Sequence, residues 1–158
     1  MNRDGGVRCH GAAWDLGEDG QLLRVLPVAA QAQIVAAIAE LEDARYAPAL
    51  ALFSAARHAY DDGPRRDRDA CCNVFDALES VGKIKYNRPN DTFGQVKNHI
   101  EQNNLARREI VDIFTALNQM RNQHFGHGMA VQFNLSGAEV DFVYLNCIGS
   151  ILLLTRTP

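Results

Sequence analysis

Residues 121–128, with the sequence Arg-Asn-Gln-His-Phe-Gly-His-Gly, bring together side chains that can do chemistry on a polar substrate. Arg121 supplies a cation that stays charged at physiological pH, and Asn122 supplies an amide that can orient a neighbouring group. His124 and His127 carry imidazoles that titrate near neutral pH, so either can give or take a proton. This combination suits acid–base chemistry beside a fixed positive charge.

The residues before this segment predict the direction of the Arg121 side chain. Apolar residues recur at helical spacing at Ile110, Phe114 and Leu117, and one further step of four reaches Arg121. We therefore expect the guanidinium at the end of a core-facing stripe, where an unpaired charge would be costly. A purely local explanation also exists, because a cation in the last turn and a left-handed glycine after it, here Gly126, stabilise a helix end without any function.

The same segment resembles the signature of the HEPN superfamily, in which an arginine, usually followed by a polar residue, precedes a histidine by four to six positions. Arg121 and His127 have five residues between them, Asn122 is the polar residue, and the trailing His-Gly is similar to the abortive-infection C-terminal branch. Residues 77–83, Ala-Leu-Glu-Ser-Val-Gly-Lys, resemble the Leu-Glu-(Ser/Thr)-x-x-Lys pattern of the first bundle helix in that branch. The likeness covers about residues 66–155.

The resemblance implies an all-α bundle that forms a homodimer and cleaves RNA without a metal or cofactor, in phage defence or in a toxin–antitoxin system. Arg121 and His127 would be catalytic, with Asn122 assisting them. The supporting residues that it implies are Glu79, Lys83 and His124. The chemistry is coherent, because an imidazole can take the proton of a 2′-hydroxyl while a guanidinium stabilises the phosphate oxygens. One chain supplies one motif histidine, so an acid and a base over one phosphate would come from two copies.

The supporting residues also have ordinary explanations. Glu79 could pair with Arg121 or His127 across the bundle, but Glu79 and Lys83 are equally spaced for an i,i+4 surface pair. His124 could assist catalysis or contact RNA, or it could be a solvated histidine at a helix end. Two imidazoles in one turn lack a third metal ligand, which disfavours a metal site. Four arginines could follow an RNA backbone or form a solvated charged surface: Arg65, Arg66, Arg107 and Arg108.

Two other functions compete with RNA cleavage. Some members of the superfamily have lost activity, so a HEPN-like module for dimerisation or for binding a nucleotide or another ligand is the first alternative. The net charge of −3 favours it slightly over a nuclease that binds polyanions. The second alternative is an unrelated helical bundle in which residues 121–128 only end a helix. For a toxin, an antitoxin or a regulatory protein would be a further partner.

The rest of the sequence predicts six helices that position this segment. Apolar spacing, prolines and capping residues predict helices over about residues 28–44, 48–60, 66–86, 92–103, 106–125 and 137–155. The last four, joined by short links, predict the HEPN-like four-helix bundle over 66–155, and residues 28–63 add two accessory helices to a single domain, 28–158. Residues 1–27 predict a tail or a small hairpin. The last helix is apolar on most sides, which predicts that it is buried or meets a partner chain.

Composition indicates a globular protein of the reducing cytoplasm. The chain has 158 residues, of which 47% are hydrophobic and 22% charged, enough for one domain with a real core. Its longest apolar run is far shorter than the roughly 20 residues that cross a bilayer, and no secretory signal is visible at the start. The four cysteines have no CxxC spacing, which predicts free thiols rather than disulfides or a zinc site. We therefore expect no membrane association.

Overall fold

Helices make up most of the chain, as predicted. The computed structural model describes residues 14–16, 22–24, 26–126 and 132–158. Its α-helices are α1 (Val28–Leu41), α2 (Ala47–Asp61), α3 (Asp67–Lys85), α4 (Phe93–Gln102), α5 (Arg108–Met120) and α6 (Gly137–Arg156). A 3-10 turn, η1 (Ala44–Tyr46), precedes α2, and a π-helical turn, η2 (Arg121–Phe125), continues α5. Near the N-terminus, β1 (Trp14–Leu16) and β2 (Leu22–Arg24) pair antiparallel. The all-α prediction is confirmed.

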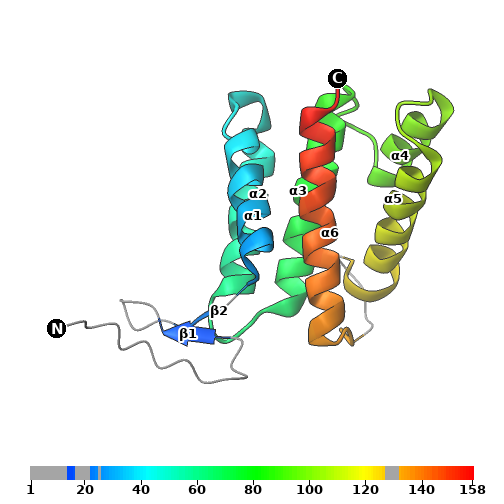
Figure 1. Ribbon diagram of the computed structural model, residues 1–158. Helices are drawn as coiled ribbons and strands as arrows, with labels where there is room; N and C mark the ends of the chain where they lie inside the picture. Colours follow the sequence, from blue (N-terminus) through cyan, green and yellow to red (C-terminus); the bar gives the residue numbers. More distant parts are fainter. Residues whose placement is uncertain (1–13, 17–21, 25, 127–131) are drawn as a thin grey trace.

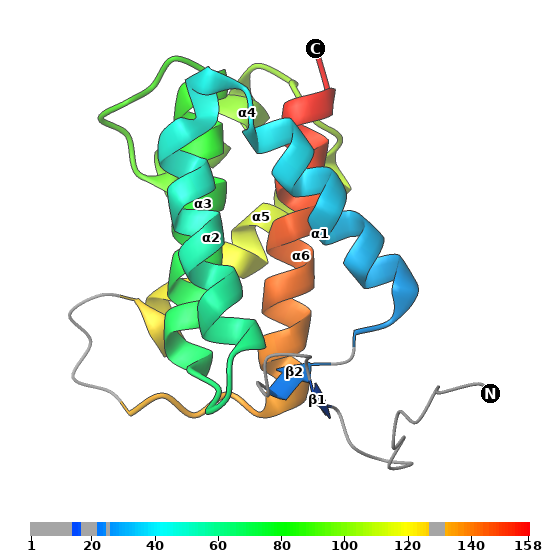
Figure 2. The ribbon, with the colours of Figure 1, turned by 90° about the vertical axis from the view of Figure 1, so that its left-hand side faces the viewer.

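The six helices are arranged as three neighbouring pairs, which are seen side by side in Figure 1. α3 and α6 form the central pair, α1 and α2 cover one side of it, and α4 and α5 lie on the other side. Seen from the side of α1 and α2, the bundle has the start of α3, the end of α5 and the start of α6 together at its lower end (Figure 2). The motif segment therefore lies where three helix ends meet.

Two capping boxes fix the beginnings of α4, which precedes α5, and of α6, which follows the motif segment. The Thr92 hydroxyl accepts from the backbone N–H of Gln95, and the Gln95 side chain accepts from the backbone of Thr92, at the start of α4. Ser136 and Glu139 make the same reciprocal pair at the start of α6. The hydrogen bonds from Ser136 lower the pKa of the Glu139 carboxyl, so the cap is formed with an ionised glutamate. Local sequence thus sets where α6 begins.

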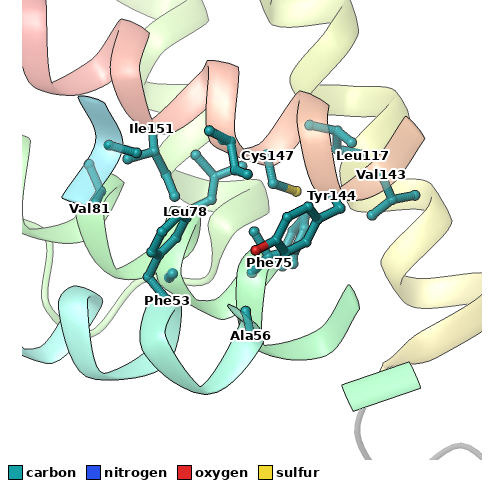
Figure 3. Packing of buried hydrophobic residues seen from close by; sticks show 14 of the residues in the cluster. Phe53, Ala56, Phe75, Leu78, Val81, Leu117, Val143, Tyr144, Cys147 and Ile151 are labelled. Atoms are coloured by element: carbon teal, nitrogen blue, oxygen red, sulfur yellow. The ribbon is translucent and has the colours of Figure 1, made fainter. Parts of the chain in front are cut away.

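The core lies between α3 and its neighbours and contains buried residues from all six α-helices. Figure 3 shows Phe53 of α2, Phe75 and Leu78 of α3, and Tyr144 and Ile151 of α6 packed together. Phe75 also makes an edge-on contact with Phe93 of α4, with ring centres 5.0 Å apart. Because α3 is in the middle, its side chains position almost every other element.

α6 behaves as a core helix on one side only. Its length and hydropathy would allow it to cross a membrane, but half of its most apolar window is buried inside the bundle, as in the core helix of a soluble protein. Cys147, Ile148 and Ile151 are fully buried, whereas Phe142 is 59% exposed. The expectation that this helix is buried holds for the side that faces α3.

Two stacked tyrosines join α2 to α6. The rings of Tyr60 and Tyr144 are parallel, with centres 4.0 Å apart, and the Tyr60 hydroxyl donates to Asp141 at 2.9 Å. The Tyr144 hydroxyl has no hydrogen-bond partner, and in residues 26–126 and 132–158 it is the only buried side-chain oxygen or nitrogen in that condition. Burial also raises the pKa of Tyr144 well above its ordinary value, so the hydroxyl stays neutral.

We expect opposite effects from removing the two hydroxyls. Tyr144→Phe should leave the free energy of unfolding unchanged or raise it by up to about 1 kcal/mol, because an unpaired buried hydroxyl pays a desolvation cost. Tyr60→Phe should lower it by about 1 kcal/mol, because Asp141 loses a hydrogen-bond donor. Urea denaturation of both variants measures the difference, and a larger loss in Tyr144→Phe than in Tyr60→Phe would contradict this account.

Candidate functional site

The segment singled out by the sequence continues α5 as the π-helical turn η2, Arg121–Phe125. π-helical turns are rare and occur often at functional sites, because the widened turn changes the direction of the side chains that it carries. Gly126 ends the turn with φ −61° and ψ 153°, which is extended backbone. The left-handed glycine cap that would have explained this segment as an ordinary helix end is therefore not formed.

The Arg121 guanidinium faces α3, as the apolar stripe predicts. Its Nη2 atom lies 3.2 Å from Oδ1 of Asp76, and its Cζ atom lies 5.2 Å from the centre of the Phe75 ring. The side chains of Arg121 and Asp76 are 24% and 21% exposed, so the ion pair is partly shielded from water. Arginine has five N–H donors, and this pair leaves some of them for another acceptor.

The end of the turn is anchored by side chains of α3. The Phe125 ring is fully buried and meets the Phe75 ring edge-on at 6.3 Å. The Cys72 thiol donates to the Phe125 carbonyl, and Nη2 of Arg68 donates to the Gly126 carbonyl at 3.2 Å. The last carbonyls of a helix have no partner within the helix, so these two donors replace a local cap.

Burial raises the pKa of the Cys72 thiol, and the negative charge of Asp76 raises it further, while Arg68 and Arg121 oppose the shift. A thiol with a raised pKa keeps its proton at neutral pH, which is what its hydrogen bond to Phe125 requires. Cys72 is therefore a structural donor in this site and not a nucleophile.

The anchoring residues share one face of α3. Cys72 follows Arg68 by four residues, and Phe75 and Asp76 follow Cys72 by three and four, which are the spacings that place side chains on the same face of a helix. Along this face α3 presents a cation, a thiol, an aromatic ring and a carboxylate to η2. The whole turn is thus positioned by a single straight element.

The other residues of the turn face outward. Asn122 is exposed, and His124 is half-buried with its Nδ1 atom 3.3 Å from Oδ1 of Asn134. The predicted base, His127, lies outside the described residues, as does Gly128. The structure therefore brings Arg121, Asn122 and His124 together in one turn directly before residue 127.

Of the partners considered for Glu79, the structure shows Lys83. Oε1 of Glu79 lies 2.6 Å from Nζ of Lys83, which is the expected i,i+4 pair, and Arg121 pairs with Asp76 instead. Asp76 and Glu79 are three residues apart on α3 and point in similar directions. The height of η2 along α3 decides which of the two meets the guanidinium.

The four arginines proposed for RNA lie at both ends of the bundle. Arg65 is only 17% exposed: it pairs with Asp67 and Asp141 and lies 5.4 Å above the Tyr60 ring, so its charge is used within the fold. Arg66 is exposed, 3.8 Å from Asp69. Arg107 and Arg108 are at the start of α5, roughly 20 Å from its end at 1.5 Å per residue. These arginines form no continuous track beside η2.

A metal or cofactor site is not visible in the described part of the chain. Residues 26–126 and 132–158 contain no group of three or more His, Cys, Asp or Glu side chains that could hold a metal ion. Cys71, Cys72 and Cys147 are free and buried, and burial raises the pKa of Cys71 to about 12. What the described residues of the site offer chemically is a guanidinium held against α3 and, on the outer side of the same turn, an exposed amide and an imidazole.

Sequence reasoning missed three contacts of the turn with α3. Asp76 accepts from Arg121, and Cys72 and Arg68 donate to the carbonyls of Phe125 and Gly126. Asp76 interrupts the apolar run Val74-Phe75-Asp76-Ala77-Leu78 of α3, and an acid within such a run is a signal of a buried partner. Cys72 and Arg68 precede it on the same face by one and two turns. Their role as donors to backbone carbonyls has no sequence signal.

The Arg121–Asp76 pair should contribute measurably to stability. Asp76→Ala should lower the free energy of unfolding by about 1–2 kcal/mol, between the values typical of exposed and buried ion pairs, because it leaves a shielded guanidinium unpaired. Glu79→Ala, one turn further along α3, removes an i,i+4 pair whose side chains are equally shielded and should cost a similar amount, so the coupling to Arg121 and not the size of the loss distinguishes the two acids. A double-mutant cycle with Arg121→Ala should give a coupling energy for Asp76 and none for Glu79, and coupling to Glu79 alone would refute this geometry.

Comparison of the chain with protein-family models, with curated proteins and with solved structures finds no match in any of the three.

Proposed function

We propose that this protein is a metal-independent endoribonuclease of the HEPN type, acting in the cytoplasm in phage defence or in a toxin–antitoxin system. Arg121 binds and stabilises the phosphate, and His127 transfers protons. Asn122 orients either the His127 imidazole or the phosphate. The observation that carries the proposal is the partly exposed Arg121 guanidinium, held by Asp76 and Phe75 in a π-helical turn that directly precedes His127.

The order of the helices supports the proposal. A helix with the Leu-Glu-Ser-x-x-Lys stretch, a short middle helix, a helix that ends in the arginine and a terminal apolar helix follow each other as α3, α4, α5 and α6. This order is the one that the resemblance implies for residues 66–155. The resemblance in two motifs and the order of the elements thus agree.

Arg121 is suited to a phosphate whose charge grows during the reaction. In cleavage by the 2′-hydroxyl, a base removes its proton, the oxygen attacks phosphorus, and an acid protonates the leaving 5′-oxygen. Asp76 fixes the guanidinium before the substrate arrives, so little reorganisation is needed when the phosphorane forms. The free N–H donors of the guanidinium then bind the phosphate oxygens as a planar fork.

The proposed active unit is a homodimer, because one chain contributes a single motif histidine. Two copies whose η2 turns face each other would supply a base and an acid across one phosphate. A regulatory protein or antitoxin that covers η2 would restrain such an enzyme. The Leu-Glu-Ser-x-x-Lys residues Glu79 and Lys83 would then support the bundle rather than the chemistry, since they bind each other.

An inactive HEPN-like binding module is the second candidate, and one observation favours it. The charge of Arg121 is already balanced by Asp76, which weakens its attraction for an anion compared with a free guanidinium. In that case the same turn binds a nucleotide or another ligand without cleaving it. Activity of the intact protein on RNA separates the two candidates.

The purified protein should cleave total RNA in buffer that contains EDTA. His127→Ala and Arg121→Ala should each reduce the rate by about 10²–10³-fold or more, because each removes a group that acts on the transition state. Arg121→Lys keeps the charge but loses the planar fork and should be impaired as well. Gel analysis of the RNA gives the rates.

Glu79→Gln is the matched control, because it alters the neighbouring Glu79–Lys83 pair of α3, leaves the Arg121–Asp76 pair intact and should retain full activity. Cleavage that requires a divalent metal, or that persists in His127→Ala, would disprove the mechanism. Retained nucleotide binding without cleavage in the wild type would establish the binding module instead.

A further inference from the structure

The side of α6 that faces away from α3 is apolar and uncovered. Phe142 is 59% exposed there, and Ile113 of the neighbouring α5 is 43% exposed. Figure 1 shows α6 in front of α3, with α1 on one side and α5 on the other. Large apolar side chains gathered on one face mark contact surfaces more often than isolated ones do.

Between these helices lies a groove of about 370 Å³. Its floor is α6, and its walls are α5 and α1; the residues that line it are Gln33, Ile110, Ile113, Phe114, Leu145, Asn146, Gly149, Ser150 and Leu153. A Cβ atom built on Gly149 would have no other atom within 4 Å, so the floor is open at this residue. The Asn146 amide donates to the Phe142 carbonyl of its own helix, which satisfies one of its two N–H donors.

The face carries both a protruding side chain and a hollow. Phe142 stands out about one turn before the groove begins at Leu145 and about three turns before it ends at Leu153, on the same side of the helix, so the ring of one copy can enter the Leu153 end of the other copy's groove. Contact between two copies related by a two-fold axis requires such self-complementarity, because each surface must supply what the other receives. A foreign partner would need only the hollow.

Charges at the two ends of the face are complementary as well. Residues 142–155 contain no charged side chain, while exposed Glu139 precedes this stretch and exposed Arg156 follows it. Arg156 binds Glu40 through Nε at 2.8 Å and retains further donors on its guanidinium. Two copies of α6 laid antiparallel bring each acid near the other copy's arginine.

We propose that the groove on α6 receives a second copy of this chain, with the two α6 helices packed antiparallel about a two-fold axis. When Asn146 of one copy lies opposite Gly149 of the other, the same register sets Phe142 opposite Leu153 and Glu139 opposite Arg156. In this arrangement the apolar contact, the pairing of the charged residues at the ends and the antiparallel helix dipoles are all favourable.

This interface goes beyond the proposed function and does not depend on it. The centre of the antiparallel contact lies near residue 148, roughly 15 Å along α6 from its first turn, beside which η2 is located. The α6 pairing therefore leaves η2 open to RNA or to a separate contact. Loss of the α6 contact and loss of nuclease activity are therefore measured by different experiments and can be told apart.

Sedimentation velocity over a range of concentrations tests the surface. The wild type should be a dimer through α6, or a tetramer if the η2 turns pair copies as well, and Phe142→Glu should raise the dissociation constant of the α6 contact by roughly tenfold or more, because a charge is buried without a partner. Val35→Glu is the matched control: Val35 is 66% exposed on α1 and does not line the groove, so the dimer should persist. Circular dichroism confirms that the variants are folded.

A monomeric wild type at about 100 μM, or an assembly whose mass is unchanged in Phe142→Glu, would overturn the proposal. An assembly that is lost in His127→Ala but retained in Phe142→Glu would show that copies pair only through the motif, which contradicts the α6 interface and leaves the nuclease proposal intact. Dissociation of the α6 contact in Phe142→Glu together with loss of RNA cleavage in His127→Ala would support both proposals at once.

Cross-linking tests the register. In a Cys9→Ser background, copies carrying Asn146→Cys and copies carrying Gly149→Cys should form disulfide-linked dimers when mixed, because the two positions face each other. Either variant alone should cross-link much less, since identical positions lie further apart. Efficient cross-linking of Asn146→Cys with itself, or none in the mixture, would contradict the antiparallel register.

Discussion

The ion pair between Arg121 and Asp76 joins the end of α5 to the middle of α3, and the position of the π-helical turn depends on it. Each of these charges is about three-quarters removed from water, so either one alone would be costly. Their pairing offsets the cost of removing each charge from water and fixes the position of α5 along the axis of α3. The backbone carbonyls of Phe125 and Gly126 are then within hydrogen-bond reach of Cys72 and Arg68 of α3.

A single aromatic ring organises both ends of the turn. The face of Phe75 receives the Arg121 guanidinium, and the same ring contacts Phe125 edge-on. Both contacts follow the charge distribution of an aromatic ring, which is negative on its faces and positive at its edge. Phe75 also packs on Phe93 of α4, so the site is connected to the core rather than attached to its surface. Rigid support of this kind is what a preorganised cation requires.

The sequence predicts the helices and the direction of Arg121, but it does not predict the partner of Arg121. Apolar spacing and capping residues depend on local geometry, so the helix boundaries are close to the expected ones. Asp76 and Glu79 differ by about 4.5 Å in height along α3, and only the packing of α5 against α3 selects between them. For the same reason Arg65 belongs to a surface charge run in the sequence, yet in the fold it lies over Tyr60 and binds Asp141.

The charges around η2 limit how any anion is recognised there. Asp76 and Asp69 lie near Arg68 and Arg121, and Glu139 interacts with His124, so acids balance the cations around the turn, while Glu79 and Lys83 cancel each other. The chain as a whole is negative, so long-range attraction toward a polyanion is weak, and salt screens it further. Binding at η2 must therefore come from contact, through oriented N–H donors and the exposed Asn122 amide. A site built in this way selects for the geometry of a ligand more than for its total charge.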